Sequence, residues 1–574
     1  MNHSLSRPLR HHAARGAATF ASSLIGASLL LSAPAWSAPA PVIPGAGTIL
    51  QSVKPLAPPS VSPSETGLKL DQQRSSDWPP TAPFVVTQLQ ISGNTVFDTA
   101  LLHELVKDGE GKSLTLAEIG ALAERITTYY HQHGYPLARA IVPAQKIDGG
   151  IVLIQVLEAR YGKIGLNNSS KVDSRLLQST LTPLQGGALI GQAELDHTLL
   201  LLSDIPGVAI RSSLKPGAAV GSSDLETEVT ATAAVVGSVA LDNDGSRYTG
   251  RTRATGRISL LNPLNHGDVL SFTAMSGGSD LHYGQAYYDT LLDGVGTRVG
   301  GSYSALSYTL GDTLSDLGGH GTAAVTSLWL SRPFIRSPAT NLYGKFALDR
   351  AVLHDRIDAS ATQTDRHLLN ATWSAYGDQR DSWLAGGVST WRVALISGEV
   401  TFENGSAQTA DAATANTDGR YVKYALSGVR LQTLSERDSL YVALSGQGAN
   451  GNLDASQKMV AGGSDTVRAY DSSVLSGDEG LLATIELRHT LGWQLPGYWQ
   501  AIAFVDSQYL KINQSPWANG QNTATLSGAG VGLNWSGAGG WSARLSVATR
   551  IGNLPSLLAT AAATRGWIEI NKGF

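Results

Sequence analysis

The sequence predicts an α+β region joined to an all-β region: two small βααββ modules, then a transmembrane antiparallel β-barrel of about sixteen strands. Three observations predict this fold. Charged residues make up only 15% of the 574-residue chain, against about 25% in typical soluble domains. Glycine is frequent, at 63 residues. Period-two alternation of apolar and polar residues recurs from residue 233 to the end, which is typical of strands with one apolar face.

The composition excludes several functional classes. The net charge is −4, from 42 basic and 46 acidic residues, so the chain lacks the excess of positive charge that is typical of nucleic-acid-binding proteins. Because there is no cysteine, there can be no disulfide, thiol nucleophile or thiolate metal site. The 13 histidines show no H-E-x-x-H spacing, and the chain has no Gly-x-Ser-x-Gly elbow. We therefore expect no catalytic residue, no cofactor, no metal and no enzyme activity.

Residues 1–35 have the layout of a secretory signal peptide. Arg7, Arg10 and Arg15 precede an apolar stretch from Ala17 to Leu31, and small residues follow up to Ala35. The apolar stretch is shorter than the roughly 20 residues that a membrane-spanning helix needs. We therefore expect export, with cleavage after Ala35 or a few residues later.

Residues 36–83 predict a short helix followed by a linker. The stretch 46–53 allows one or two helical turns, with Ile49, Leu50 and Val53 as its apolar residues. Seven prolines follow between residues 55 and 83. Proline lacks an amide donor and favours extended backbone, so the segment is predicted to be a stiff, unfolded linker. A short helix on such a tether can dock elsewhere in the molecule.

Residues 84–159 and 160–232 each predict the order β-α-α-β-β. In the first module, Thr115 and Glu118 form a capping box ahead of a helix with apolar residues at helical spacing. The second module repeats the order, with helices near 172–179 and 192–202. An RNA-binding KH module would need a GxxG clamp in a basic patch, which is missing. Peptide docking by strand addition at a sheet edge is the favoured alternative.

Residues 233–574 predict the barrel. Along 499–509, Trp499, Val505 and Tyr509 share one face, while Phe504 and Asp506 share the other. Ten steps of about 3.3 Å, tilted near 40°, cover about 25 Å of membrane. One such strand would also suit a soluble sandwich, but the pattern recurs at 531–535 and 541–547. Apolar outside and polar inside describe a barrel around water.

The chain ends on a strand with an aromatic last residue. Ile568, Ile570 and Phe574 are expected on one face. This ending is typical of the signal that the barrel insertion machinery reads in outer-membrane proteins.

The assembled pattern resembles the TpsB transporters of two-partner secretion, in the outer-membrane translocase superfamily that includes BamA. The resemblance covers nearly the whole mature chain. It implies a plug helix at 44–55, with Ile49, Leu50 and Val53, two POTRA domains at 84–159 and 160–232, and a barrel at 233–574. It rests on several stretches of sequence, which are ISGNTVF at 91–97, VPAQ at 142–145, LSDIPGV at 202–208, and LDNDGSRYTG at 241–250.

The stretch 462–470 is similar to the V-R-G-Y/F tip of the superfamily's sixth extracellular loop, here Val467, Arg468, Ala469 and Tyr470. The family's acidic partner of the arginine lies in an F-x-D strand motif, which matches Phe504 and Asp506. We expect a partly solvated ion pair that contributes little net stability but fixes the loop. Ala469 stands where the pattern has glycine. If that position needs a positive φ, the alanine would strain the tip.

The resemblance implies an outer-membrane pore of a Gram-negative bacterium, with periplasmic POTRA domains, that recognises and secretes one large partner exoprotein such as a hemolysin or adhesin. The implied partners are this exoprotein, outer-membrane lipid and the barrel assembly machinery, without nucleic acid, and a monomer is expected. One alternative is a factor that inserts other barrels into the membrane. Another is a passive porin, although a porin would not need the two modules.

Overall fold

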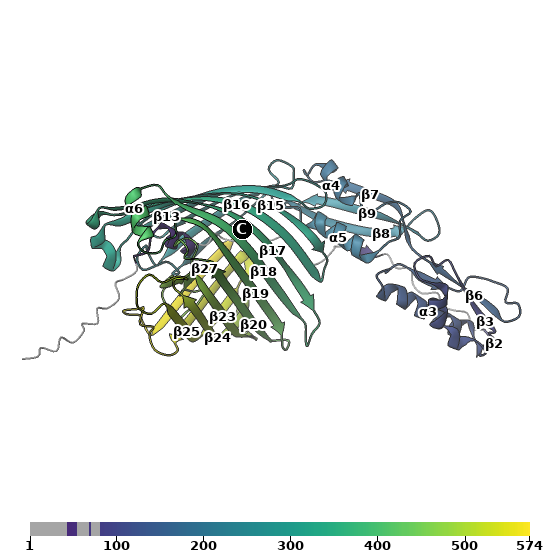
Figure 1. The fold of residues 1–574 in the computed structure, drawn as a ribbon. Helices are drawn as coiled ribbons and strands as arrows, with labels where there is room; N and C mark the ends of the chain where they lie inside the picture. Colours follow the sequence, from purple (N-terminus) through teal and green to yellow (C-terminus); the bar gives the residue numbers. More distant parts are fainter. Residues whose placement is uncertain (1–42, 54–67, 71–80) are drawn as a thin grey trace, which may run out of the picture. The chain divides into compact units, whose positions relative to one another are not determined.

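The computed structural model describes residues 43–53, 68–70 and 81–574 (Figure 1). The predicted signal peptide at 1–35 lies outside these residues. Within the described ranges, no helix has both the length and the apolar character needed to cross a membrane.

Sixteen strands form one closed barrel in which each strand pairs antiparallel with its neighbours, and the last strand pairs with the first. The predicted strand number is therefore confirmed. The barrel strands are β10 (Val235–Asp242), β11 (Arg253–Leu261), β12 (Val269–Ser276), β13 (Leu281–Leu291), β14 (Arg298–Thr309), β15 (Gly319–Arg336), β16 (Thr340–Ile357), β17 (Thr362–Asp381), β18 (Gly387–Phe402), β19 (Gly419–Thr433), β20 (Asp438–Ala449), β23 (Glu479–Leu491), β24 (Tyr498–Lys511), β25 (Thr523–Ser536), β26 (Trp541–Arg550) and β27 (Thr564–Gly573).

The two faces of the barrel wall differ as the alternation predicts. On β24, Val505 and Tyr509 are 48% and 46% exposed, whereas Phe504 is 4% and Asp506 0% exposed. Val531, Leu545 and Val547 on the following strands are also exposed. A wall with apolar residues outside and polar residues inside is what a bilayer requires of a barrel that holds water.

The end of the chain closes the barrel. Ile568 and Ile570 of β27 are exposed on the outer face, as is Phe574. The backbone of Phe574 exchanges two hydrogen bonds with Gly237, at 2.9 and 3.0 Å, which extends the β10–β27 ladder by one residue pair. The expected shared face is confirmed. The reading of these residues by insertion machinery stays a prediction.

The first module contains the predicted β-α-α-β-β order, together with two further two-residue strands and a 3-10 turn that were not predicted. It consists of β2 (Phe84–Val85), β3 (Gln88–Ser92), α2 (Thr99–Glu104), η1 (Lys107–Gly109), β4 (Ser113–Leu114), α3 (Leu116–Gln132), β5 (Arg139–Ile141) and β6 (Ile151–Leu157). The capping box of Thr115 and Glu118 at the start of α3 is confirmed. Ile119, Ile126 and Tyr130 of α3 are buried in the module's core with Val152 and Ile154 of β6.

The second module has the elements β7 (Arg160–Asn168), α4 (Ser174–Leu181), α5 (Gln192–Ser203), β8 (Val208–Pro216) and β9 (Ser222–Ala231). Its sheet has a fourth strand that comes from the linker: β1 (Leu68–Leu70) pairs parallel with β8, and the sheet order is β1-β8-β9-β7. The expectation of an unfolded linker is therefore wrong at 68–70. Linker backbone satisfies hydrogen-bonding groups along an edge that β8 would otherwise expose.

Glu158, at the end of the first module, holds the loop that carries the ISGNTVF stretch. Its carboxylate accepts hydrogen bonds from the backbone N–H groups of Thr95 and Val96, at 2.6 and 2.8 Å. It also accepts from the Thr95 hydroxyl and, at 2.8 Å, from the Tyr130 hydroxyl. Burial raises the pKa of Glu158, but the hydrogen bonds together outweigh burial, so its pKa lies below the usual value.

We expect Glu158→Gln to destabilise the first module by about 2–4 kcal/mol, because a buried charged acceptor is lost and donors around it become unsatisfied. A carboxylate with a lowered folded pKa stabilises the fold above its unfolded pKa, and this contribution is lost as pH falls through the folded pKa. The mutational effect should therefore shrink below about pH 4.3. Hydrogen exchange of α3 and β6 in the full chain measures it. Glu104→Gln, at an exposed pair with Lys107, is the control. An equal loss in both variants would contradict the role of Glu158.

Candidate pore, loop anchor and plug

Loop 6, residues 450–478 between β20 and β23, contributes buried side chains to a core cluster with barrel-wall residues. It contains a small hairpin of β21 (Met459–Ala461) and β22 (Leu475–Gly477). Val467 and Ala469 at its tip are fully buried, and Tyr470 nearly so. They pack with Phe504 of β24 and Leu526 of β25. The predicted tip motif therefore lies against the inner wall.

Arg468 meets Asp506, as the two motifs predict. Its Nε and Nη2 donate to the two carboxylate oxygens at 2.8 and 2.7 Å, and its backbone N–H donates to Oδ2 at 3.2 Å. Nη1 donates to Glu486 of β23 at 2.7 Å. The guanidinium also lies 3.3 Å from the ring centroid of Phe504. A bidentate fork stacked on an aromatic face suits arginine and not lysine.

The pair is buried, so the expectation of a partly solvated ion pair is wrong. Asp506 is 0% and Arg468 7% exposed, and the Thr484 hydroxyl donates to Asp506 at 3.0 Å. The indole N–H of Trp567 on β27 donates to the Arg468 carbonyl at 2.7 Å. Three strands, β23, β24 and β27, thus contribute to one anchor. A buried pair is costly to break from one side, which gives this anchor more weight than an exposed pair would have.

Ala469 is accommodated without strain. Its φ is not in the left-handed region. Among the described non-glycine residues of this loop, only Ser473 has a positive φ. The room for its methyl group comes from β25: a Cβ added to Gly528 would lie 2.5 Å from the Cβ of Ala469. Because Gly528 has no side chain, it leaves the space that the methyl group of Ala469 occupies.

The predicted plug helix is α1 (Ala46–Ser52), which contacts β14, β15 and β16. Ile49 and Val53 are buried, and Leu50 packs on the same cluster of lumen residues. The N–H of Ala46 donates to Asp355 of β16 at 2.6 Å, and Arg253 of β11 donates to the Ser52 carbonyl at 3.1 Å. Both helix ends are thus bonded to the barrel wall, which satisfies orphan backbone groups.

Loop 6 also contacts α1. A Cβ added to Gly47 would lie 2.6 Å from the backbone nitrogen of Ser456, so only glycine permits this approach. Ser456 N–H donates to Asp454 at 2.8 Å, and Arg366 of β17 bonds both Asp454 and Asp355, at 2.5 and 2.7 Å. Arg366 therefore bonds both Asp355, which accepts from the first N–H of α1, and Asp454, which lies in the loop turn that touches Gly47.

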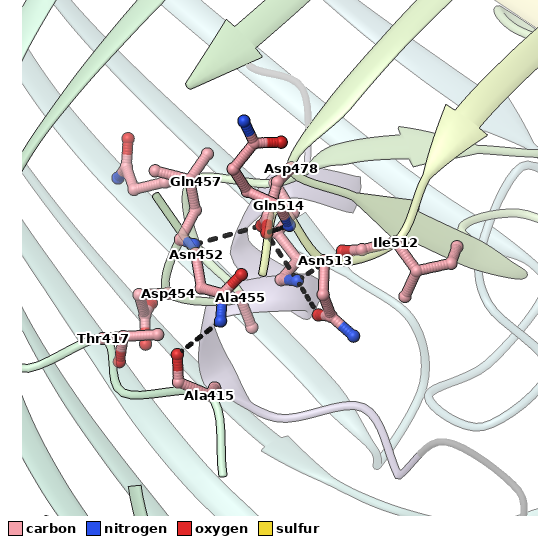
Figure 2. A network of polar contacts seen from close by, with 12 residues as sticks. Ala415, Thr417, Asn452, Asp454, Ala455, Gln457, Asp478, Ile512, Asn513 and Gln514 are labelled. Atoms are coloured by element: carbon pink, nitrogen blue, oxygen red, sulfur yellow. Dashed lines mark hydrogen bonds and ion pairs between the residues drawn. The ribbon is translucent and has the colours of Figure 1, made fainter. Parts of the chain in front are cut away.

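Figure 2 shows the polar network that connects this part of loop 6 to its neighbours. Asp478 accepts from the backbone N–H groups of Leu453 and Gln514 and pairs with Lys458 at 2.9 Å. Asn452 donates to the carbonyls of Ala415 and Ser515, at 2.6 and 2.9 Å. Loop segments near 415, 452 and 514 are thus bonded together at the barrel end where β20 finishes and β25 begins.

Several residues of this site were not predicted from the sequence. Glu486 and Trp567 complete the anchor, and Asp355, Arg366 and Asp454 receive the plug helix. Their alternation marks them as lumen residues, but period-two patterning gives no information on which lumen residues from distant strands meet.

Comparisons with known proteins agree with this geometry. The family model "Haemolysin secretion/activation protein ShlB/FhaC/HecB" matches residues 221–535, more than half of the chain. The model "POTRA domain, ShlB-type" matches residues 84–159. The chain is 28% identical over 486 residues to the heme/hemopexin transporter protein HuxB of Haemophilus influenzae strain 86-028NP, covering 82% of this chain and 84% of that protein.

Two solved structures share the fold. CdiB from Escherichia coli matches with a TM-score of 0.68 at 20% identity, over 88% of this chain and 93% of that one. BamA from Haemophilus ducreyi, lacking POTRA domains 1–3, matches with a TM-score of 0.52 at 12% identity, over 86% of this chain and 100% of that one. The predicted resemblance is confirmed. With its closed sixteen-stranded barrel, its POTRA module and its inward loop, the chain belongs to the family of haemolysin secretion/activation proteins ShlB/FhaC/HecB.

Proposed function

We propose that this protein secretes one large partner exoprotein through its barrel, with docking on the two periplasmic modules and gating by α1 and loop 6. As a member of this family, the chain is an outer-membrane protein with its modules in the periplasm. The observation that carries the gating proposal is the double occupation of the lumen: α1 and the tip of loop 6 both pack on the inner wall. A polypeptide can pass only if at least one of them moves.

Docking by strand addition needs a free sheet edge. In the first module β3 and β5 are the outer strands of the sheet β3-β6-β5. In the second module the β8 edge is covered by β1, so a segment that pairs with β8 must first displace the linker. Backbone pairing would give affinity, and pockets for alternate side chains would give selectivity. The relatives' names suggest a heme- or hemopexin-related exoprotein or a CdiB-type cargo as the substrate class.

Co-expression tests the secretion proposal. In a Gram-negative host that lacks related transporters, a candidate partner is any long exported protein encoded by a neighbouring gene, and we expect the true partner to reach the medium only when the chain is present. Without the chain, the exoprotein should stay in the periplasm and be degraded. The control is an unrelated exported protein of similar length, which should not reach the medium. Release of both proteins would indicate leakage, and release of neither would contradict the proposal.

The alternative, a factor that assembles other barrels, is favoured by the BamA-like fold alone. Removing this chain would then lower the amounts of other outer-membrane barrels. Secretion predicts that those amounts stay constant while export stops, so quantifying the outer-membrane barrels separates the two functions.

A further inference from the structure

The inner wall near the periplasmic end of the barrel carries aromatic rings and cations that neither the loop anchor nor the plug uses. We define the entry patch as Tyr287 of β13, Trp329 of β15, Tyr343 and Lys345 of β16, Tyr376 of β17, and Arg392 of β18. Side chains alternate between the two faces of a strand, and the outer face of these strands is marked by exposed residues of opposite parity to the patch. These are Leu328, Phe346, Trp373 and Trp391. The patch therefore faces the lumen.

The position of the patch along the barrel follows from the strand ends. β10 starts after the second module, so the turns between β13 and β14, β15 and β16, and β17 and β18 lie at the periplasmic end. Tyr343 is three residues from the start of β16, and Tyr376 is five residues from the end of β17. The helix α1 instead meets Asp355, near the other end of β16. A chain that enters from the periplasm would meet the patch before the plug.

The rings form two stacked pairs. Tyr343 and Tyr376 are register partners, and their rings stack at 5.2 Å between centroids with an angle of 10°. Tyr287 and Trp329 stack at 5.0 Å and 26°. Tyr343, Tyr376 and Arg392 also line one cavity of about 530 Å³. Tyrosine and tryptophan offer large rigid contact area at low entropic cost, which is why they dominate binding surfaces.

The cations of the patch are available for a ligand. Lys345 Nζ lies 4.6 Å from the Trp329 ring centroid, and the Arg392 guanidinium lies 6.0 Å from that of Tyr376. Among the described residues, neither has a carboxylate within ion-pair distance. Two other lumen arginines have ion-pair partners: Arg298 pairs with Asp289, and Arg366 pairs with Asp355 and Asp454. Lys345 and Arg392 are thus cations without an ion-pair partner in the described part of the chain, on a wall that also carries carboxylates: Asp289 and Asp349 act electrostatically on Lys345, and Asp204 and Asp378 line the same cavity as Arg392.

We propose that the entry patch binds the unfolded exoprotein, selecting extended segments that carry aromatic and acidic side chains. The proposal deepens the proposed function and rests on it. Aromatic side chains of the passing chain stack on the tyrosine rings, and its carboxylates meet Lys345 and Arg392, while the buried Trp329 supports Tyr287 and Lys345 from behind. Each contact is worth little and exchanges readily, so the patch can hold a polypeptide without arresting it.

A matched site lies further around the barrel wall, on β20 and β23. Tyr441 is the fourth residue of β20, as Tyr343 is of β16, and the Arg488 guanidinium lies 4.1 Å from the Tyr441 ring centroid. Arg488, however, is paired with Glu486 at 2.7 Å. Tyr441→Ala therefore removes a lumen tyrosine beside an arginine at the same depth, and it leaves Lys345 and Arg392 unchanged.

The experiment measures fluorescence anisotropy of two labelled peptides with the full-length protein in detergent micelles. One peptide is built from Tyr, Ser and Glu, and the other has Lys in place of every Glu. We expect the acidic peptide to bind about tenfold more tightly than the basic one. The double variant K345Q/R392Q should remove this preference, Y343A/Y376A should weaken both peptides, and Y441A should match the wild type. Only barrels that keep the heat-modifiable mobility of a folded barrel are compared.

Export of the exoprotein by the same variants separates the two proposals. If the wild type exports its partner but binds both peptides equally, or if Y441A loses as much binding as Y343A/Y376A, the entry patch is wrong and the proposed function stands. If the acidic peptide binds as expected but the wild type exports no partner, the proposed function fails. Slower export by K345Q/R392Q, with normal export by Y441A, would support both.

Discussion

Replacing Arg468 by alanine is expected to release the tip of loop 6 and to stop export while leaving the barrel inserted. The substitution leaves Asp506 fully buried, and Glu486 8% exposed in its side chain, without their shared cation. Removing one partner of a buried pair costs about 3–5 kcal/mol. The ladders of the sixteen strands are unchanged, so this cost falls on the contact between loop and wall. Limited proteolysis of loop 6 in intact cells measures the released fraction, and export is measured in parallel.

The control for Arg468→Ala is Arg251→Ala. Arg251 also bonds loop 6, through Asp471 at 2.6 Å, but its side chain is 42% exposed and Asp471 keeps Arg565 as a second partner. A surface ion pair is worth about 0–1 kcal/mol, so this variant should export at the wild-type rate. Normal insertion and full export by Arg468→Ala would show that the anchor has no part in gating.

Local patterns predicted the parts of the fold that depend on nearby residues. The capping box at Thr115 and Glu118, the two faces of 499–509 and the order of elements in both modules follow from spacing within a few residues. Pairing of Arg468 with Asp506 came from two motifs that the family resemblance linked. The sequence also provided Ile49, Leu50 and Val53 as the apolar face of a short helix.

Other features depend on contacts between distant segments, which periodicity does not encode. The pairing of β1 with β8 joins residues that are more than 140 positions apart, and three residues in a proline-rich segment carry no strand pattern of their own. The burial of the Arg468 anchor was underestimated because Trp567 and Glu486 close it from β27 and β23. The strain expected at Ala469 is removed by Gly528, a wall glycine whose role appears only once β25 faces the tip.

In the resting pore, Arg366 connects the plug helix to loop 6 through two carboxylates. Arg366 bonds Asp355, which receives the start of α1, and Asp454, which orients Ser456 against Gly47. A displacement of loop 6 near residue 454 would therefore also loosen the carboxylate that holds the helix. The tip at Arg468 is bonded to other strands, β23, β24 and β27, so loop 6 has two separate attachments to the wall.

Gly47→Leu is expected to expel α1 and open the channel. An added Cβ would lie 2.6 Å from the Ser456 nitrogen and 3.0 Å from its Cα, and these are backbone atoms held in place through Asp454. Overpacking of this kind costs typically about 1–3 kcal/mol. The helix is seven residues long, and the larger apolar side chains that it and its C-cap bury are Ile49 and Val53, each worth about 1.5–3 kcal/mol. The clash is thus comparable to what retains the helix, and the open fraction should rise about tenfold or more.

Conductance in planar bilayers at low voltage and sensitivity of cells to large antibiotics measure this opening. Thr48→Leu is the matched control, because Thr48 is half-buried on the same helix and has no side-chain hydrogen bond among the described residues. It adds similar apolar bulk at the next position of the helix, where burial is incomplete, so its conductance should stay at the wild-type level. If neither variant conducts more than the wild type, close approach at Gly47 does not hold the plug. Equal opening in both variants would instead mean that any added bulk expels α1, and the contact with Ser456 would lose its special role.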